Sequence, residues 1–210
     1  MSSRKYDDAE LRILDAAHRV FMRRGTAGAR TQEIADEAGV NKSMLHYYFR
    51  TKERLADAVF ERAASRWLRE LTEAMDDDAP IDAIVRAVIR GETQAIEERP
   101  YLSGYLMSEV HHRPDQVRVA LRSMPEIRLE KLRDRLRAAS SSGEILPISA
   151  EDFVVHLVSL VVFPHAARDL FQASLRMDDP KWEAAMDRRI ERLTAFFLRG
   201  LGFQETGDPT

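Results

Sequence analysis

Apolar residues recur at helical spacing along nearly the whole of this 210-residue chain, and this periodicity constrains the fold more than any other feature of the sequence. The longest stripe has a four-residue spacing and consists of Leu55, Val59, Ala63, Trp67, Leu71 and Met75. No segment alternates apolar and polar residues like a strand, and Asn-Gly and Asp-Gly hairpin turns are absent. We therefore predict an all-α fold of nine or ten helices.

Glycines and prolines divide this pattern into segments. The expected helices cover about 8–24, 32–38, 42–49, 51–76, 81–99, 101–112, 115–123 and 126–139, with two more that begin at Ser149 and at Pro180. We expect the hydroxyl of Thr31 to cap the second helix, because a side-chain oxygen can accept from the unpaired amides of a first turn. Pro164 removes one backbone hydrogen bond, so it should bend the helix that begins at Ser149, and with His165 this bend is the expected opening onto a cavity.

The charge of the chain is unevenly distributed. The whole chain has 32 Lys and Arg residues against 35 Asp and Glu residues, a net charge of −3 that argues against a protein that coats nucleic acid nonspecifically. Residues 1–57 carry a net charge of +2, with 11 basic and 9 acidic residues, whereas the remainder carries −5. If an anionic polymer is a partner, it is the first quarter of the chain that would meet it.

Other sequence features bear on location and on excluded chemistry. The absence of cysteine excludes disulfides and thiolate metal sites, and the N-terminus lacks the apolar core of a secretion signal. The apolar run from Phe153 to Phe163 is about half as long as a bilayer span requires. We therefore expect a cytoplasmic protein that does not enter membranes.

Enzymatic and metal-binding interpretations have little support in the sequence. Glu109 and His112 form one half of the carboxylate di-iron arrangement, but the second half is missing. Asp152 and His156 lie four residues apart and could be metal ligands, although histidine on a half-buried helix is more often structural. The nucleophile motif G-x-S-x-G is absent. We expect no catalytic residue, no bound metal and no cofactor.

Two short helices joined at Gly39 and Val40 are what a helix-turn-helix requires. A short exposed helix can enter the major groove of B-form DNA, where each base pair presents its own pattern of donors and acceptors. The helix over 42–49 offers Lys42, Ser43 and His46 for such contacts, whereas Leu45 and Phe49 are expected to pack beneath it.

The same region resembles the tetracycline-repressor (TetR) family of bacterial transcription regulators. The matching stretches are ILDAAHRVFMRRG and TQEIADEAGVNKSMLHYYFRTKERL, which together cover about residues 11–60. The resemblance implies a helix-turn-helix DNA-binding domain at residues 1–51 and a helical ligand-binding and dimerisation domain at residues 52–210. It also implies base contacts by Gln32, Lys42, Ser43 and His46, and phosphate contacts by Thr31, Tyr47, Tyr48 and Lys52. The chain departs from the common pattern at Met44, which cannot donate a hydrogen bond to phosphate, and at His46, where tyrosine is frequent.

For the rest of the chain the resemblance implies an effector pocket and a homodimer. We expect a small, largely apolar or aromatic effector, and the candidate lining residues are Trp67, Leu102, Tyr105, Leu106, Met124, His156, Leu160 and Phe163. Each of these residues also has an ordinary interpretation as core. The two most apolar C-terminal helices suggest a four-helix dimer interface that uses Phe171, Leu175, Trp182, Met186 and Phe197.

The sequence thus predicts a homodimeric repressor that binds a palindromic double-stranded DNA operator and leaves it when a small molecule binds. The alternative is a helical ligand-binding or adaptor protein whose N-terminal helices contact protein rather than DNA.

Overall fold

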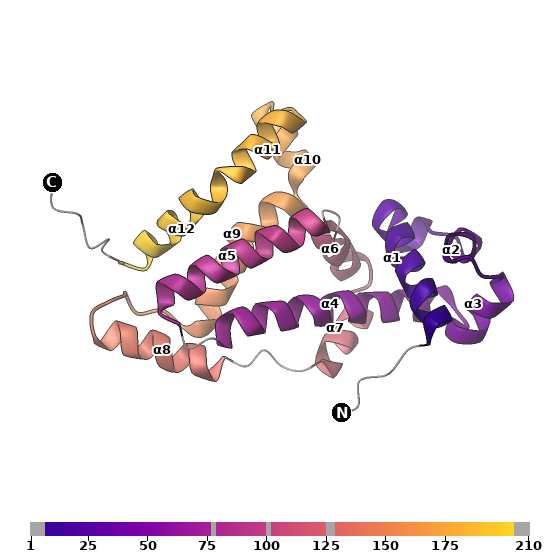
Figure 1. The fold of residues 1–210 in the computed structure, drawn as a ribbon, viewed down its shortest axis with the longest axis horizontal. Coiled ribbons are helices and arrows are strands. Elements are labelled where there is room, and N and C mark those ends of the chain that lie inside the picture. The colour runs from indigo at the N-terminus through magenta and orange to yellow at the C-terminus, as the bar shows by residue number, and fades with distance from the viewer. Residues whose placement is uncertain (1–6, 77–78, 100–101, 125–128, 204–210) are drawn as a thin grey trace. The chain divides into compact units, whose positions relative to one another are not determined.

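The computed structural model describes residues 7–76, 79–99, 102–124 and 129–203 (Figure 1). All regular structure in these residues is α-helical, which confirms the predicted fold class. The described residues form twelve helices, more than the nine or ten that were expected. They are α1 (Asp8–Gly28), α2 (Thr31–Ala38), α3 (Lys42–Phe49), α4 (Lys52–Asp76), α5 (Ile81–Glu98), α6 (Leu102–His112), α7 (Pro114–Ser123), α8 (Glu130–Ser141), α9 (Ala150–Ala166), α10 (Arg168–Leu175), α11 (Asp179–Asp187) and α12 (Arg189–Gly200).

The helices belong to two compact units. The first unit contains residues 1–67 and 104–126, and the second contains residues 68–103 and 127–210. The first unit therefore combines the N-terminal helices with most of α6 and with α7, which lie much later in the sequence. The domain division predicted between residues 51 and 52 coincides with the start of α4 but with no boundary of either unit, and as a division of function it stays a prediction.

Helix α1 is fixed at both ends by its own sequence. The side chain of Asp7 accepts a hydrogen bond from the backbone N–H of Glu10 at 2.8 Å, which satisfies one of the unpaired amides of the first turn. Near the other end, Gly25 leaves the helical conformation with a φ of 66°, a region that costs glycine little because it has no Cβ. One more helical turn follows to Gly28. Gly25 was expected just beyond the end of this helix, and it marks this break.

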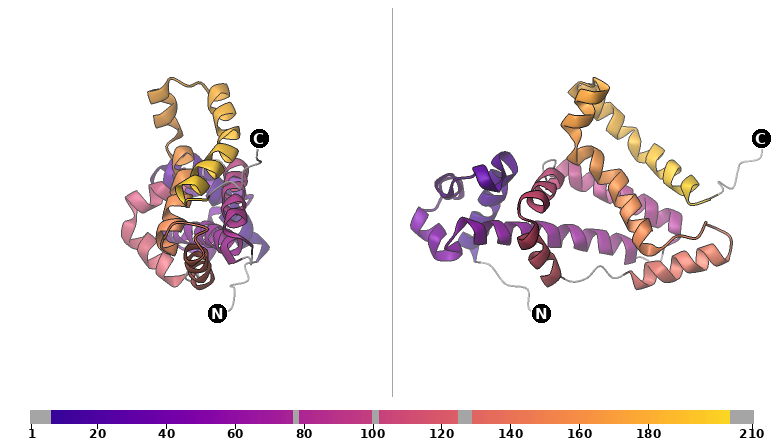
Figure 2. Two further views of the ribbon diagram at one scale, coloured as in Figure 1. Left: turned by 90° about the vertical axis from the view of Figure 1, so that its left-hand side faces the viewer. Right: turned by 180° about the vertical axis from the view of Figure 1, so that it is seen from behind.

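The second unit has a core in which α5 packs against α9 and α12 (Figures 1 and 2). Helix α5 buries an apolar stripe that includes Ile84 and Val88, at the spacing of one helix turn. Phe153 of α9 meets Phe197 of α12 edge-on, with ring centroids 5.4 Å apart. The apolar run of α9 is thus only partly core, because only every fourth residue from Phe153 to Val161 is buried.

Pro164 lies inside α9 without ending it. The helix continues to Ala166, and its axis turns by 72° before α10 begins. Proline has no N–H to donate to the carbonyl of Leu160, and instead the guanidinium of Arg189 donates to that carbonyl at 3.0 Å. The bend expected from the sequence therefore occurs three residues further along the chain. A second break at Arg188 separates α11 from α12, and these two breaks account for the larger number of helices.

No single helix in the described ranges has both the length and the apolar composition needed to cross a membrane. The bent pair of α9 and α10 meets these two criteria only when both helices are taken together.

Candidate nucleic-acid interface

Helices α2 and α3 form a helix-turn-helix in the first unit (Figure 1). Helix α2 ends at Gly39, which adopts a left-handed conformation with a φ of 64°. The side chain of Asn41 then accepts a hydrogen bond from the backbone N–H of Met44 at 2.8 Å and so caps α3. The cap on α2 was predicted incorrectly. Arg30, without a side-chain cap bond, precedes α2, and Thr31 is its first helical residue.

Helix α3 has one buried face and one exposed face. Leu45 and Phe49, four residues apart, are buried and fix the helix to the unit beneath it. Lys42, Ser43 and His46 are exposed, and Lys42 and His46, four residues apart, lie on one side of the helix. The three residues predicted to read bases from this helix are therefore brought together on one accessible surface.

His46 closes the C-terminal end of α3. The backbone N–H of Arg50 donates to the carbonyl of His46 at 2.9 Å. In the opposite direction, the Nδ1 atom of His46 lies 2.8 Å from the carbonyl oxygen of Arg50. Arg50 itself has a φ of 53°, which is uncommon for a residue other than glycine. Two hydrogen bonds between the same pair of residues thus hold both the backbone turn and the imidazole ring.

Tyr47 and Tyr48, both predicted to contact phosphate, differ in their surroundings. Tyr47 is 79% exposed, and its ring meets the ring of Tyr48 edge-on at 5.2 Å. The hydroxyl of Tyr48 donates to the carboxylate of Asp7 at 2.6 Å. This hydrogen bond raises the pKa of Tyr48 to about 12 and lowers the pKa of Asp7. Sequence reasoning missed this contact because the two residues lie 41 positions apart.

Two further predicted DNA contacts, Lys52 and Gln32, also have partners within the chain. The ammonium of Lys52, in the first turn of α4, donates to the carbonyl oxygens of Ala27 at 3.2 Å and Ala29 at 3.3 Å. The side-chain amide of Gln32 donates to Asp36 on the next turn of α2 at 2.8 Å. Lys52 therefore ties α4 to the last turn of α1 and to Ala29, which follows it, while Gln32 is held along its own helix.

Ion pairs fasten α2 to α1. Glu37 of α2 accepts hydrogen bonds from Arg23 and, at 2.6 Å, from Arg19. The guanidinium groups, that of Arg23 most strongly, hold the pKa of Glu37 below its usual range. Arg24 donates to Glu33 at 2.9 Å. Several arginines of this basic region thus serve the packing of the helix-turn-helix, which lowers the number available to an anionic partner.

A second ion cluster in the first unit is centred on Glu109 of α6, which is only 2% exposed. Its carboxylate accepts from the hydroxyl of Thr26 at 2.6 Å and from Arg113 at 2.9 Å. Arg113 also pairs with Asp57 of α4. Glu109 therefore has protein partners, whereas His112 is exposed and bonds to the carbonyl of Ser108 at 2.9 Å. Within the described ranges, no three potential metal ligands gather at one place.

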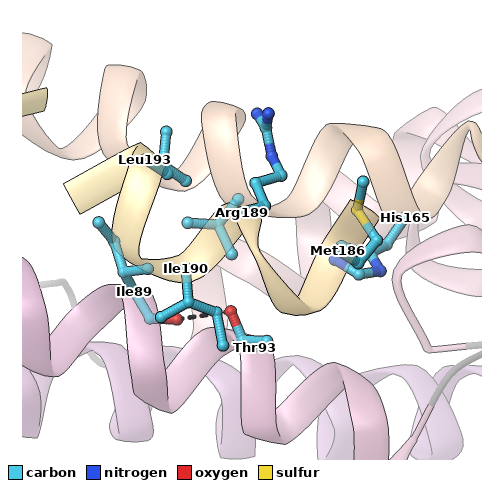
Figure 3. A pocket seen from close by; sticks show the side chains of 8 residues that line it. Ile89, Thr93, His165, Met186, Arg189, Ile190 and Leu193 are labelled. Atoms are coloured by element: carbon cyan, nitrogen blue, oxygen red, sulfur yellow. Dashed lines mark hydrogen bonds between the residues drawn. The ribbon is translucent and has the colours of Figure 1, made fainter. Parts of the chain in front are cut away.

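A small cavity lies in the second unit between α5, α9, α11 and α12 (Figure 3). Its volume is about 10 Å³, which is roughly the space that one water molecule requires. His165 lines it, and burial together with Arg189 and Arg168 lowers the pKa of this histidine. The cavity in this form is far too small for an acyl chain or an aromatic effector.

None of the residues predicted to hold an effector lines this cavity. Neither compact unit contains the whole predicted set, since Trp67, Tyr105, Leu106 and Met124 belong to the first unit, and Leu102, His156, Leu160 and Phe163 belong to the second. Tyr105 is buried, whereas His156 and Phe163 are exposed. Sequence periodicity identified apolar positions here but could not tell which of them share a cavity.

The residues predicted for a dimer interface have mixed exposure within one chain. Trp182 and Phe197 are buried in the second unit, Phe171 and Met186 are half-buried, and Leu175 is 61% exposed. Phe171 stacks on Trp182 with ring centroids 6.4 Å apart. Large apolar side chains that the sequence did not single out, Val155 of α9 and Phe196 of α12, are 60% and 67% exposed. If an interface forms on α9 and α12, the buried aromatic residues lie behind it rather than in it.

The N-terminal part of the chain matches known regulators in sequence. Residues 13–59 match the family model described as bacterial regulatory proteins, tetR family. The HTH-type transcriptional regulator RutR of Escherichia coli is 37% identical over 98 residues, which is 47% of this chain and 46% of RutR. An HTH-type transcriptional repressor of Mycobacterium tuberculosis is 33% identical over 102 residues, which is 48% of this chain and 50% of the repressor. The chain thus spans about half the length of the curated relatives it matches.

Solved structures extend the likeness in fold to nearly the whole chain. A fatty acid degradation regulator, FadR from Bacillus halodurans, has a TM-score of 0.68 at 14% identity and covers 96% of this chain and 100% of its own. A TetR-like transcriptional regulator from Rhodococcus sp. RHA1 has a TM-score of 0.65 at 20% identity, with coverage of 96% and 100%. Residues 13–59 thus match the tetR family model and the relatives aligned in sequence are HTH-type transcriptional regulators, while the solved structures share the all-helical fold over nearly the whole chain.

Proposed function

We propose that this protein is a sequence-specific DNA-binding transcription regulator, and that it acts as a repressor which a small molecule releases from its operator. The observation that carries the proposal is the exposure of Lys42, Ser43 and His46 on α3, a helix that the buried Leu45 and Phe49 fix to the rest of the first unit. A helix held in this way can enter the major groove with its polar face toward the base edges.

In this proposal Gln32 and the α3 face contact bases, while Thr31, Tyr47, Tyr48 and Lys52 contact phosphates. The ammonium of Lys52 has three N–H donors, and two carbonyl oxygens engage it, so one donor remains for a phosphate. Tyr48 must first release the carboxylate of Asp7 before its hydroxyl can donate to a phosphate. We therefore expect Lys52 and the exposed Tyr47 to contribute more to affinity than Tyr48.

Selection of binding sites from random duplex DNA, followed by titration of the selected site at several salt concentrations, tests the function directly. The binding constant should fall log-linearly with salt, with a slope of about 0.9 for each neutralised phosphate. The selected sequence should be an inverted repeat. A helical adaptor protein would select no sequence, and such a result would exclude the proposed function.

Two substitutions separate the two classes of contact. Lys52→Ala should weaken binding to selected and random duplexes by similar factors, because phosphate contacts carry no sequence information. His46→Ala should instead change which sequence is selected. Lys181→Ala, at an exposed lysine of α11, provides a matched control for the loss of one positive charge. The opposite pattern for Lys52 and His46 would contradict the assigned roles.

We further propose a homodimer. When the helix-turn-helix of one protomer binds one half of a palindromic operator, the helix-turn-helix of its partner is held at a high effective concentration near the other half. The proposed interface region contains Phe171, Leu175 and Met186, with the buried Trp182 and Phe197 behind them, and the exposed Phe196 offers the sharpest test. Phe196→Asp should shift the protein from dimer toward monomer in sedimentation at micromolar concentration. A wild-type protein that sediments only as monomer would refute this proposal.

The proposed effector is a small, largely apolar or aromatic molecule that binds between the C-terminal helices. The effector must bind the conformation that cannot bind DNA more tightly than the conformation that can. Equal affinity for the two conformations would leave their populations unchanged. A thermal-shift screen should find stabilising compounds among apolar and aromatic molecules, and these should reduce operator binding. Stabilisation by highly charged metabolites alone would overturn this assignment.

A further inference from the structure

We infer that His46 selects a base that carries an amino group, adenine or cytosine, at one position of each operator half-site. This inference rests on the proposed function, because it requires that α3 enter a major groove. It adds to that function the chemical identity of the group that His46 recognises.

The hydrogen bond at the end of α3 determines which ring nitrogen of His46 carries the hydrogen. The Nδ1 atom of His46 lies 2.8 Å from the carbonyl oxygen of Arg50. A carbonyl oxygen can only accept, so Nδ1 must carry the hydrogen. A neutral imidazole has one ring N–H, and the bond at Nδ1 therefore leaves Nε2 as an acceptor with a lone pair.

The turn at Arg50 fixes the orientation of the imidazole ring. Arg50 donates its own N–H back to the carbonyl of His46 at 2.9 Å, and its φ of 53° turns its carbonyl oxygen to within reach of the imidazole. A 180° turn of the ring would place the carbon Cδ2 where Nδ1 now lies, and so would break the hydrogen bond to the carbonyl oxygen of Arg50. The acceptor at Nε2 is thus a fixed property of the neutral side chain.

An acceptor on α3 can be matched in the major groove only by a base that presents a hydrogen-bond donor. Adenine presents its N6 amino group and cytosine its N4 amino group, and these are the donors among the base edges there. Guanine and thymine present acceptors at the corresponding places. An acceptor on an exposed side chain therefore favours adenine or cytosine on the strand that it touches and disfavours guanine or thymine. Lys42, one turn earlier on the same face, has only donors and is expected to favour guanine instead.

The test is site selection from random duplex DNA at pH 8, where histidine side chains are neutral. The wild-type protein should select adenine or cytosine over guanine or thymine by about three- to tenfold at one position per half-site, the ratio that one hydrogen bond provides. His46→Ala should abolish the preference at that position alone. His46→Lys replaces an acceptor by a donor and should reverse the preference toward guanine or thymine.

Two controls test the Arg50 carbonyl oxygen and the amino group of the base separately. Arg50→Gly removes a side chain but keeps the carbonyl oxygen and the positive φ, so the preference should remain. If the selected base is adenine, a purine that lacks the N6 amino group should weaken wild-type binding about three- to tenfold and leave His46→Ala unaffected. If it is cytosine, an analogue without the N4 amino group serves in the same way.

The outcomes distinguish the two levels of inference. If no duplex is selected by the wild-type protein, the proposed function fails and the role of His46 fails with it. If a site is selected but the His46 variants keep the wild-type preferences, or the position they affect prefers guanine or thymine in the wild type, the inference about His46 is overturned while the function stands. Thermal unfolding of each variant confirms that the exposed substitutions leave the fold intact.

Discussion

The buried carboxylate of Glu109 should contribute strongly to the stability of the first unit. Glu109→Ala removes two hydrogen bonds to an ionised carboxylate, at 2.6 Å from Thr26 and 2.9 Å from Arg113. Hydrogen bonds to charged groups each contribute about 1.5–3 kcal/mol. Arg113 keeps Asp57 as a partner, and the variant no longer has to desolvate a carboxylate. We therefore expect a loss of about 2–3 kcal/mol, less than the roughly 3–5 kcal/mol typical when a buried charge is left without any partner.

Urea unfolding followed by tryptophan fluorescence measures this loss. In a Trp182→Phe background the remaining Trp67 reports on the first unit, and the background change cancels when variants are compared. The double variant Glu109→Ala/Thr26→Ala should show a coupling free energy of about 1 kcal/mol. Asp15→Ala removes the exposed ion pair with Arg62 and should cost only about 0–1 kcal/mol. A loss below about 0.5 kcal/mol for Glu109→Ala would refute the interpretation of this cluster as a stabilising centre.

Three further predictions follow from the burial and pKa shifts described above. Leu45→Ala should destabilise the first unit by about 2–5 kcal/mol in the same urea experiment, whereas Tyr47→Ala should have little effect; equal effects would contradict the assigned faces of α3. In ultraviolet difference titration, the hydroxyl of Tyr48 should ionise at about pH 12, and Asp7→Asn should move this midpoint toward 10; an unmoved midpoint would exclude the hydrogen bond as its cause. The pKa of His165 is lowered, which favours its neutral form. Its contribution to stability is therefore present above a pH of about 6.5 and is lost as pH falls through the lowered pKa. His165→Phe should reduce the difference in stability between pH 8 and pH 5, and an unchanged difference would argue against this role.

The helices and the helix-turn-helix were predictable because their signals are local. The spacing of Leu45 and Phe49 predicts the buried face of α3, and Gly39 predicts the turn before it. Pro164 predicts a bend because the missing N–H is a property of the residue itself. The cap by Asn41 was missed although its signal is also local, since asparagine is a preferred N-cap residue.

The partners of Tyr48 and Lys52 were not predictable, because their hydrogen bonds join residues distant in sequence. Tyr48 and Asp7 are 41 positions apart, and Lys52 reaches carbonyl oxygens more than 20 positions earlier. The interior presents the same difficulty. Periodicity shows that Tyr105 and Phe163 are apolar positions on helices, but burial of the first and exposure of the second depend on which helices pack together.

The composition of the first unit has a consequence for how the chain is made. Residues 1–67 leave the ribosome well before residues 104–126, yet both stretches belong to one compact unit. Until α6 has emerged, the hydroxyl of Thr26 lacks the carboxylate of Glu109 and Asp57 lacks Arg113. The nascent helix-turn-helix therefore gains these contacts only after a distant segment has been synthesised. A fragment that contains only the first 67 residues should be less stable than the same residues are in the full chain.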